Sequence, residues 1–419
     1  MPEAAACNPL LRTPLSIIID DSCPVVNLTY YWMHQRKAWK KKFHPDAPAD
    51  KWERDPALVD AVPPTIPSDF ARKWGEWCGE EGIRGKFSFI PFPAGVARID
   101  QGMGEFGGDE FDAWMEVGRD VLAPNFDLTP EMLTHSHVVD LETFELTDEW
   151  EQGEWVDPPV EPLTDYIATA FQLLRDAGIE VEGVTSPGAF GKKKEPQHAR
   201  AVLDAAMRVN GVTRPFYFLW VKSDEDPDVP IWYAEPEKGI AITSIVGCTG
   251  DWFGGWTGFD AGSADRFITE DLAGGRLPPI LAKELPCVLV SHWAGYYFGG
   301  DEVGFDVLKE LKRRLDAYDP DGSKTIWMKN SEIGHYWMAR ELSEITPAAD
   351  GVTVTTRFPT ENFTLRLDGP ARGVRVDGKD ITEAGSRAAF RSGKYLAEGD
   401  DVYVAFDLAE GETKVELIR

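Results

Sequence analysis

Short runs of consecutive apolar residues recur along roughly the first 340 positions of the chain, and amphipathic segments lie between them. The runs are too short for helices and several are rich in β-branched residues, which is typical of strands buried on both faces. The expected strands are residues 15–19, 86–91, 181–184, 215–221 and 287–290, and the clearest expected helices are 163–177, 199–209 and 305–318. This alternation predicts an α/β fold in which a parallel sheet is closed or wound, with helices outside.

The pattern changes after about residue 347. Short alternating segments follow one another without a helical period, and Gly, Asp and Pro turns join them. Asp377-Gly378 is a dipeptide that favours a tight hairpin turn. We therefore expect two domains, an α/β domain over residues 1–346 and a small all-β sandwich over residues 347–419, which either braces the larger domain or binds glycans.

The composition restricts the partners of the chain. Its 419 residues include 71 acidic and 43 basic ones, a formal charge of -28, so its field repels the phosphates of nucleic acids and of anionic membranes. No apolar stretch approaches the ~20 residues that a membrane span needs. The five scattered cysteines fit neither a disulfide framework nor a zinc–thiolate site. The expected location is the cytoplasm, or outside the cell if a signal peptide has been removed; the oligomeric state stays open.

Aromatic residues are abundant, with 15 Trp, 22 Phe and 11 Tyr, and many lie in Gly-rich stretches. Exposed indole rings near polar groups stack on the apolar faces of sugars. The loop-like stretches that contain Trp252, Trp256 and Trp293 therefore favour a carbohydrate ligand, although large domains also bury most of their Trp.

Polar side chains stand where several of the predicted strands end. Asp20 and Asp21 follow the run 15–19, and both reach one cavity only if the chain turns there. Two carboxylates that share a site push their pKa values apart, so one can act as a base while the other holds a cation. His292 follows the run 287–290, where an imidazole suits proton delivery near neutral pH.

A second group of candidates comes from the loops. His135 and His137 would share a face of an extended segment and could chelate one divalent ion, and Glu131 precedes them as a substrate-binding candidate. Ser186 and Pro187 form a turn that could contact substrate or simply reverse the chain. Asp251 ends another strand and could orient a base or cap a turn.

Taken in order, these clusters resemble the polysaccharide deacetylase (NodB-homology) family. Residues 17–21 (Ile-Ile-Ile-Asp-Asp) look like its strand-borne Asp-Asp motif, and His135-Ser136 like the first half of its histidine motif. Val139 stands where the second His is expected, so His137 or Asp140 would have to take its place. Residues 184–188 are similar to its Arg-Pro-x-Gly turn without the Arg. The segments that contain Asp251 and His292 resemble those that orient the base and carry the acid.

The resemblance implies a distorted (β/α) barrel of about seven strands and a hydrolase that removes an acyl group from a polysaccharide or oligosaccharide. It implies that Asp20 is the general base, that His292 is the acid and that Asp251 orients the base. A divalent ion, expected to be zinc, would be held by Asp21, His135 and His137.

Two alternatives remain open at the level of the sequence. A glycoside hydrolase on a related barrel would use paired carboxylates without a metal. A carbohydrate-binding protein that has lost its chemistry is the third interpretation, because two positions of the deacetylase motifs are changed.

Overall fold

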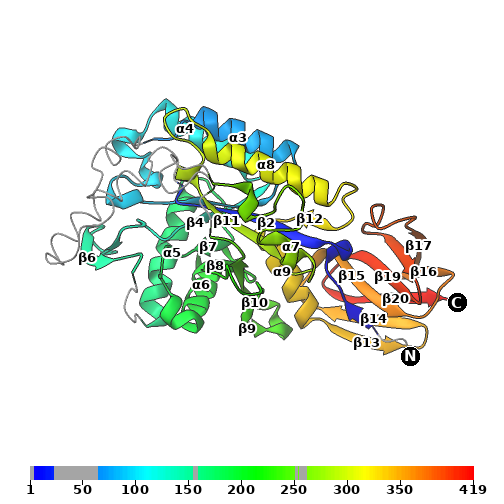
Figure 1. The fold of residues 1–419 in the computed structure, drawn as a ribbon. Helices are drawn as coiled ribbons and strands as arrows, with labels where there is room; N and C mark the ends of the chain where they lie inside the picture. Colours follow the sequence, from blue (N-terminus) through cyan, green and yellow to red (C-terminus); the bar gives the residue numbers. More distant parts are fainter. Residues whose placement is uncertain (1–3, 23–64, 154–158, 251–252, 254–261) are drawn as a thin grey trace.

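A computed structural model describes residues 4–22, 65–153, 159–250, 253 and 262–419. The larger part of the chain is built around parallel strands with helices outside them, and a mainly antiparallel sheet stands at one end (Figure 1). The barrel strands are β2 (Thr13–Asp20), β3 (Gly85–Phe89), β4 (Phe126–Pro130), β7 (Gly183–Thr185), β8 (Phe216–Val221), β10 (Ile240–Gly247) and β11 (Cys287–His292).

These seven strands run parallel in a nearly closed ring. Strand β2 pairs with β11 on one side and β3 on the other, β3 pairs with β4, and β8 lies between β7 and β10. The two halves meet at a parallel bridge between Glu131 and Thr185. On the other side the Cys248 amide donates to the Val288 carbonyl at 2.7 Å. The expected α/β fold with a distorted barrel is therefore confirmed.

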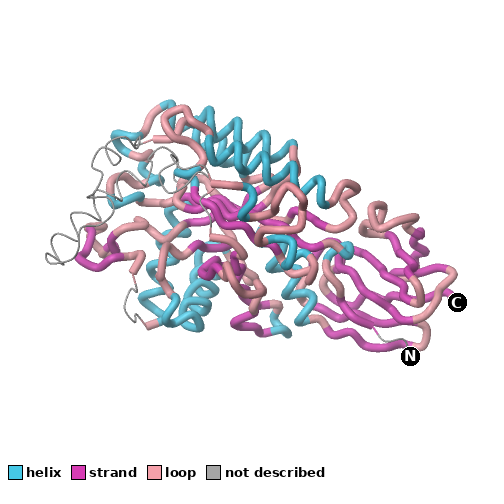
Figure 2. Tube along the Cα trace, viewed as in Figure 1, coloured by secondary structure: helices cyan, strands magenta, loops and turns pink. Residues whose placement is uncertain are grey.

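The helices cover the outside of this ring (Figure 2). Helix α5 shows why they form where they do, because Ile167, Phe171 and Leu174 recur at helical spacing and are all fully buried. The helices are α3 (Ser68–Glu80), α4 (Asp109–Glu116), α5 (Val160–Asp176), α6 (Glu195–Asn210), α7 (Leu277–Leu281), α8 (Val303–Tyr318) and α9 (Asn330–Leu342). Among the described residues, no helix is long and apolar enough to cross a membrane.

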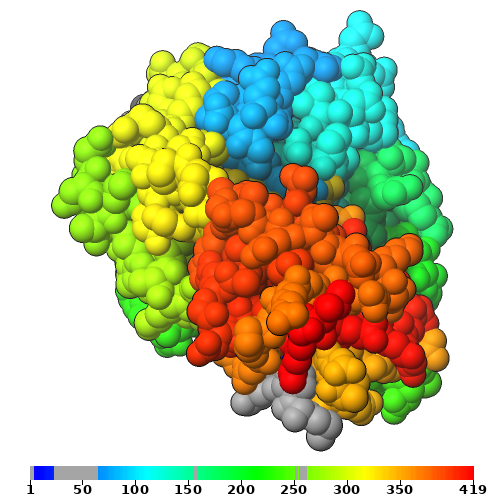
Figure 3. Space-filling view, turned by 90° about the vertical axis from the view of Figure 1, so that its right-hand side faces the viewer, coloured from blue at the N-terminus to red at the C-terminus, as the bar shows by residue number. Residues whose placement is uncertain are grey.

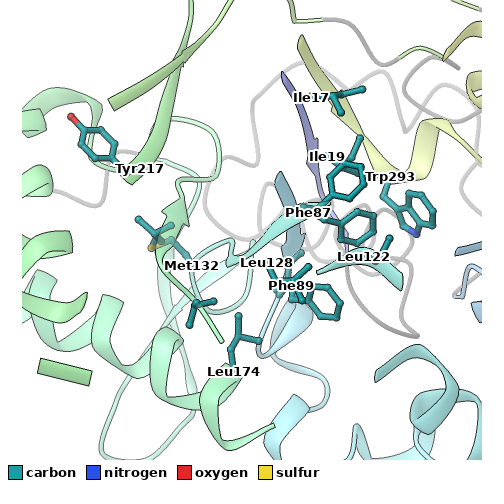
Figure 4. Packing of buried hydrophobic residues seen from close by; sticks show 14 of the residues in the cluster. Ile17, Ile19, Phe87, Phe89, Leu122, Leu128, Met132, Leu174, Tyr217 and Trp293 are labelled. Carbon is teal, nitrogen blue, oxygen red and sulfur yellow. The ribbon is translucent and has the colours of Figure 1, made fainter. Parts of the chain in front are cut away.

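The alternation of side chains along β2 and β3 divides the core in two. Ile17, Ile19, Phe87 and Phe89 belong to the layer between strands and helices, as Figure 4 shows. Ile18 belongs instead to a separate cluster with residues of β8, β10, β11 and α9. Since successive side chains on a strand point to opposite faces, the residues in phase with Ile18 face the barrel interior. This places Asp20 inside the barrel mouth.

The C-terminal part is a nine-stranded sheet in the order β1-β15-β19-β18-β17-β16-β20-β14-β13, and it forms the end of the molecule that faces the viewer in Figure 3. Its buried apolar residues form one cluster with Ala241 of β10 and with Met338 and Ala339 of α9, so the sheet packs directly against the barrel part. The strands are β13 (Glu344–Ala348), β14 (Gly351–Thr356), β15 (Thr360–Asp368), β16 (Gly373–Val376), β17 (Lys379–Glu383), β18 (Lys394–Glu398), β19 (Asp401–Leu408) and β20 (Gly411–Ile418).

Two details of this sheet bear on the sequence-based expectations. Asp377 and Gly378 both have positive φ, at 49° and 75°, and connect β16 to β17 in the predicted hairpin turn. Strand β1 (Ala4–Ala6) pairs antiparallel with β15, so the N-terminal residues lie in the sheet of the C-terminal part. The pattern of residues 347–419 alone could not show this pairing.

Candidate functional site

Asp20 and Asp21 lie at the C-terminal end of β2 and point to different partners. Asp21 has a positive φ of 53°, so the chain turns sharply directly after the strand. The Asp20 carboxylate accepts a hydrogen bond from Lys86 Nζ at 2.6 Å, and Lys86 also donates to Ser88 Oγ at 2.6 Å. Lys86 is fully buried and Asp20 is 5% exposed. The interior of the barrel mouth therefore contains an ion pair shielded from water.

The environment of Asp20 gives it the properties of a base. Burial raises the pKa of Asp20 to about 7; the charge of Lys86 opposes this rise, and the nearby Glu131 and Asp21 add to it. A carboxyl group whose pKa lies near neutrality can both accept and release a proton under ordinary conditions. Asp20 is therefore suited to take a proton from an attacking water.

Asp21, Glu131 and His135 form a compact cluster beside this pair. His135 Nε2 lies 2.6 Å from Asp21 Oδ1 and 2.9 Å from Glu131 Oε1. The Asp21 amide donates to Glu131 Oε2 at 2.9 Å. Burial alone would raise the pKa of Asp21, but His135 and His292 outweigh it and lower that pKa to about 2. Asp21 stays ionised while Asp20 titrates near neutrality, so neighbouring carboxyl groups have different roles.

The cluster has the chemistry of a cation site. One ligand atom from each of the three side chains lies within 4.8 Å of the others. Burial lowers the pKa of His135, but the negative charges of Asp21 and Glu131 outweigh burial and raise that pKa well above its ordinary value, so these charges attract a cation into a largely buried volume. A divalent cation would balance them, and carboxylate oxygen and imidazole nitrogen are ligands that such ions take. The residues therefore fit a divalent ion.

His292 completes the site from the neighbouring strand. In the parallel pair of β2 and β11, His292 is in register with Asp20. Its Nε2 atom lies 4.0 Å from Asp21 Oδ2. Burial lowers the pKa of His292, and the charges of Asp21 and Glu131 partly restore it. Residues separated by more than 270 positions thus meet at one rim of the barrel, where the C-terminal ends of the strands form the active sites of such folds.

The geometry corrects the expected ligand set. His137 lies outside the cluster, on strand β5 (His137–Val139), where its ring packs edge-on against Trp150 of β6 (Leu146–Trp150). The expectation that His135 and His137 share a face required an extended segment, but His135 has a φ of 57°. Glu131, expected to contact substrate, stands beside Asp21 and His135 instead.

Several expected substrate contacts are also corrected. Trp293 is 2% exposed and packs against Trp74, Phe87 and Trp114, so it belongs to the core and offers no face for a sugar. Ser186 is buried, donates its amide hydrogen to the Phe218 carbonyl and shares a hydrogen bond of 3.0 Å with His198 Nε2.

The next residue, Pro187, is buried as well and has no N–H to donate. Ser186 and Pro187 therefore brace the turn after β7. Asp251, Trp252 and Trp256 lie outside the described residues.

Two features of the site were missed in the sequence. Lys86 is a charged residue in an otherwise buried strand, in phase with the inward positions of β3, and a charge at such a place signals a buried partner. Glu131 and His135 have the four-residue spacing of the deacetylase histidine motif, shifted four positions upstream. Both signals are visible in the sequence once the inward phase and the spacing are considered together.

No protein-family model matches the chain, and no curated protein matches it. Among solved structures, the chain is similar to one titled "Crystal structure of Puue Allantoinase", with a TM-score of 0.43 and 11% identity over 80% of this chain and 92% of that one. It is also similar to "The endo-beta1,6-glucanase BT3312", with a TM-score of 0.31 and 9% identity over 100% and 94%. Both likenesses are low, so the chemistry of the site is derived from its own residues.

Proposed function

We propose that this chain is a hydrolase that removes an acyl group from a carbohydrate, with Asp20 as general base and His292 as general acid. The observation that carries the proposal is the pair of adjacent aspartates with opposite environments. Asp20 lies in a buried ion pair with Lys86 and Asp21 stands beside Glu131 and His135. One rim of the barrel thus holds the Asp20 carboxyl group, the cluster of Asp21, Glu131 and His135 and, on the next strand, the His292 imidazole.

The first step is attack of water on the acyl carbon. Asp20 accepts the proton of that water as the new C–O bond forms, and Lys86 keeps the carboxylate oriented and its charge balanced. A divalent ion held by Asp21, Glu131 and His135 would polarise the acyl oxygen and the water. Lys86 stays inside the barrel throughout, since it is fully buried.

The second step is departure of the sugar amine or alcohol. His292 donates a proton to the leaving atom as the carbon–nitrogen or carbon–oxygen bond breaks, so the products are a free carboxylic acid and the deacylated sugar. The separation between His292 Nε2 and Asp21 Oδ2, at 4.0 Å, leaves the imidazole close to the cluster without a short hydrogen bond between these two atoms. The carbohydrate class rests on the ordered motifs at the strand ends.

The test is an assay of both possible products. The purified protein is incubated with a panel of N-acetylated and O-acetylated oligosaccharides, and acetate and new reducing ends are measured separately. We expect acetate release that falls by about 100-fold or more in Asp20→Asn and His292→Gln. Glu149→Gln, on the exposed strand β6, is the control and should retain full activity. New reducing ends without acetate would instead indicate a glycoside hydrolase.

A further inference from the structure

A cleft of about 940 Å³ lies where the barrel meets the C-terminal sheet. Strand β9 (Ile231–Glu235), the loop 283–286 before β11, helix α9 and strands β15 and β19 contribute to its walls. Ligand pockets have volumes of about 300–1,000 Å³, so this cleft is large enough for a sizeable ligand. The loop 283–286 leads into the first residue of β11, whereas His292 ends that strand. Six residues of strand span about 20 Å, so the cleft is separate from the candidate site.

Two arginine side chains from different parts of the fold meet at this cleft. Arg340 comes from α9 and Arg366 from β15. Burial raises the pKa of the Cys7 thiol, and the charges of Arg366 and Arg340 oppose that rise, so both guanidinium groups lie near the same thiol. Arg366 is weakly paired, since its Nε atom has no hydrogen-bond partner in the described part of the chain and lies 3.6 Å from Asp368 Oδ1. Its guanidinium group can therefore still pair with an anionic ligand.

Strand β9 supplies an exposed indole ring to the cleft. Trp232 is 42% exposed, and it is the only aromatic residue among the exposed large apolar residues of the described ranges. Strand β9 stands at the edge of the sheet β7-β8-β10-β9. Trp337 of α9 also lines the cleft, and the guanidinium carbon of Arg340 lies 5.4 Å from the centroid of its ring. An indole face stacks on the apolar face of a sugar, while guanidinium groups pair with carboxylates.

The charge around the cleft differs from the charge of the whole chain. Four cationic and three acidic side chains line it, although the formal charge of the chain is -28. Two of the four cations, Lys283 and Arg387, are paired with Asp226 and Glu398, so the cleft is close to neutral. Exposed charges further away than about 8 Å are screened at physiological ionic strength. An anionic group in the cleft therefore interacts mainly with the arginines beside it.

We infer that this cleft binds a segment of an acidic polysaccharide, with Trp232 stacked on a sugar ring and Arg340 and Arg366 paired with uronate carboxylates. The saccharide class rests on the proposed function, whereas the preference for an anion rests on the residues of the cleft. A second binding site about 20 Å from the barrel mouth holds a long polymer beside the enzyme. Its effect is to raise the concentration of the polymer near the candidate site.

The test is calorimetric titration of the full wild-type chain with hexamers of galacturonate and of mannuronate that contain no acetyl groups. The same hexamers with their carboxyl groups reduced to alcohols are the matched neutral probes. We expect a uronate hexamer to bind about 10-fold or more tightly than its reduced form, and its affinity to fall as salt is added. Equal affinity for the charged and the reduced hexamers, or binding of neither, would overturn the inference.

Three variants locate the binding. Arg366→Gln should weaken the binding of the uronate hexamer by about 10-fold, and Trp232→Ala by about 5-fold. Arg375→Gln is the matched control and should keep the affinity of the wild-type protein: Arg375 lies in the same sheet, outside the lining of the cleft, and is 39% exposed against 38% for Arg366. Trp232→Ala removes an exposed side chain, so it tests the cleft even if Arg366→Gln fails to fold. Unchanged affinity in both cleft variants would place the binding elsewhere and overturn the inference.

The two hypotheses fail separately in this design, because the titration uses no turnover. If the uronate hexamers bind as expected and no substrate releases acetate, the proposed function is wrong and the cleft stands. If acetate is released and the hexamers do not bind, the role of the cleft is wrong and the proposed function stands.

Discussion

The ammonium group of Lys86 lies 2.6 Å from Asp20 Oδ1 inside the barrel, and both side chains are nearly or fully buried. Lys86 also donates to Ser88, which lies two residues further along the same inward face of β3. A buried ion pair of this kind keeps its geometry only while both partners are present, because removal of one leaves an uncompensated charge. The pair therefore couples the stability of the barrel mouth to the charge of the proposed base.

Substitution of Lys86 by Met should destabilise the protein in a pH-dependent way. The pKa of Asp20 is already raised to about 7, and loss of the opposing Lys86 charge raises it further. A carboxyl group with a raised pKa in the folded state destabilises the fold as the pH rises towards that pKa. We expect a loss of about 3–5 kcal/mol at pH 8 and a clearly smaller loss at pH 5.5, measured by urea unfolding.

The double variant Asp20→Asn with Lys86→Met provides the control for this prediction. With both charges removed, no uncompensated ion remains, so the pH dependence specific to Lys86→Met should disappear. An equal loss at both pH values in Lys86→Met would show that the ion pair does not carry this effect.

His198 should make the stability of the wild-type protein depend on pH in the opposite direction. Burial lowers the pKa of His198 from 6.5 to about 3. Since the unfolded chain binds this proton and the folded chain does not, the stability is full above pH 6.5 and falls as the pH decreases from 6.5 towards 3. His198→Gln removes this contribution. Between pH 7 and pH 5 the free energy of unfolding should therefore fall by about 2 kcal/mol more in the wild-type protein than in the variant.

Chemical unfolding curves at the two pH values measure this difference directly. Parallel pH dependence in the wild-type protein and His198→Gln would mean that folding does not lower the pKa of His198. The hydrogen bond between Ser186 and His198 could then no longer be assigned to a neutral imidazole.

Much of the fold follows from the sequence, because the apolar runs and the helical spacing of residues such as Ile167 and Phe171 depend on local periodicity. The position of Asp20 at the mouth follows as well, since it ends a buried strand. Its partner Lys86 could not be predicted in the same way, because that prediction requires knowing which side chains of β3 point into the barrel. The prediction for His137 is wrong for a related reason: His135 has a positive φ, and its amide donates to Glu151, which lies 16 positions away in the chain, so the local pattern does not show this backbone conformation.

The remaining part of the site depends on contacts between distant segments. The pairing of β1 with β15 and the link from Gln152 to Ala189 leave no periodic pattern in the sequence. Such contacts form only when whole loops pack together in the folded barrel. In the sequence, the residues that make them are therefore indistinguishable from other loop residues.

The central claim is that Asp21, Glu131 and His135 together bind one divalent ion at the mouth of this barrel, and titration calorimetry with Zn²⁺ tests it most directly. We expect one ion per chain in the wild-type protein and in His137→Gln. In Glu131→Gln we expect a Zn²⁺ affinity lower by more than about 100-fold, which is a larger loss than is usual when a residue only hydrogen-bonds to a metal ligand. Unchanged binding in Glu131→Gln together with lost binding in His137→Gln would contradict the account.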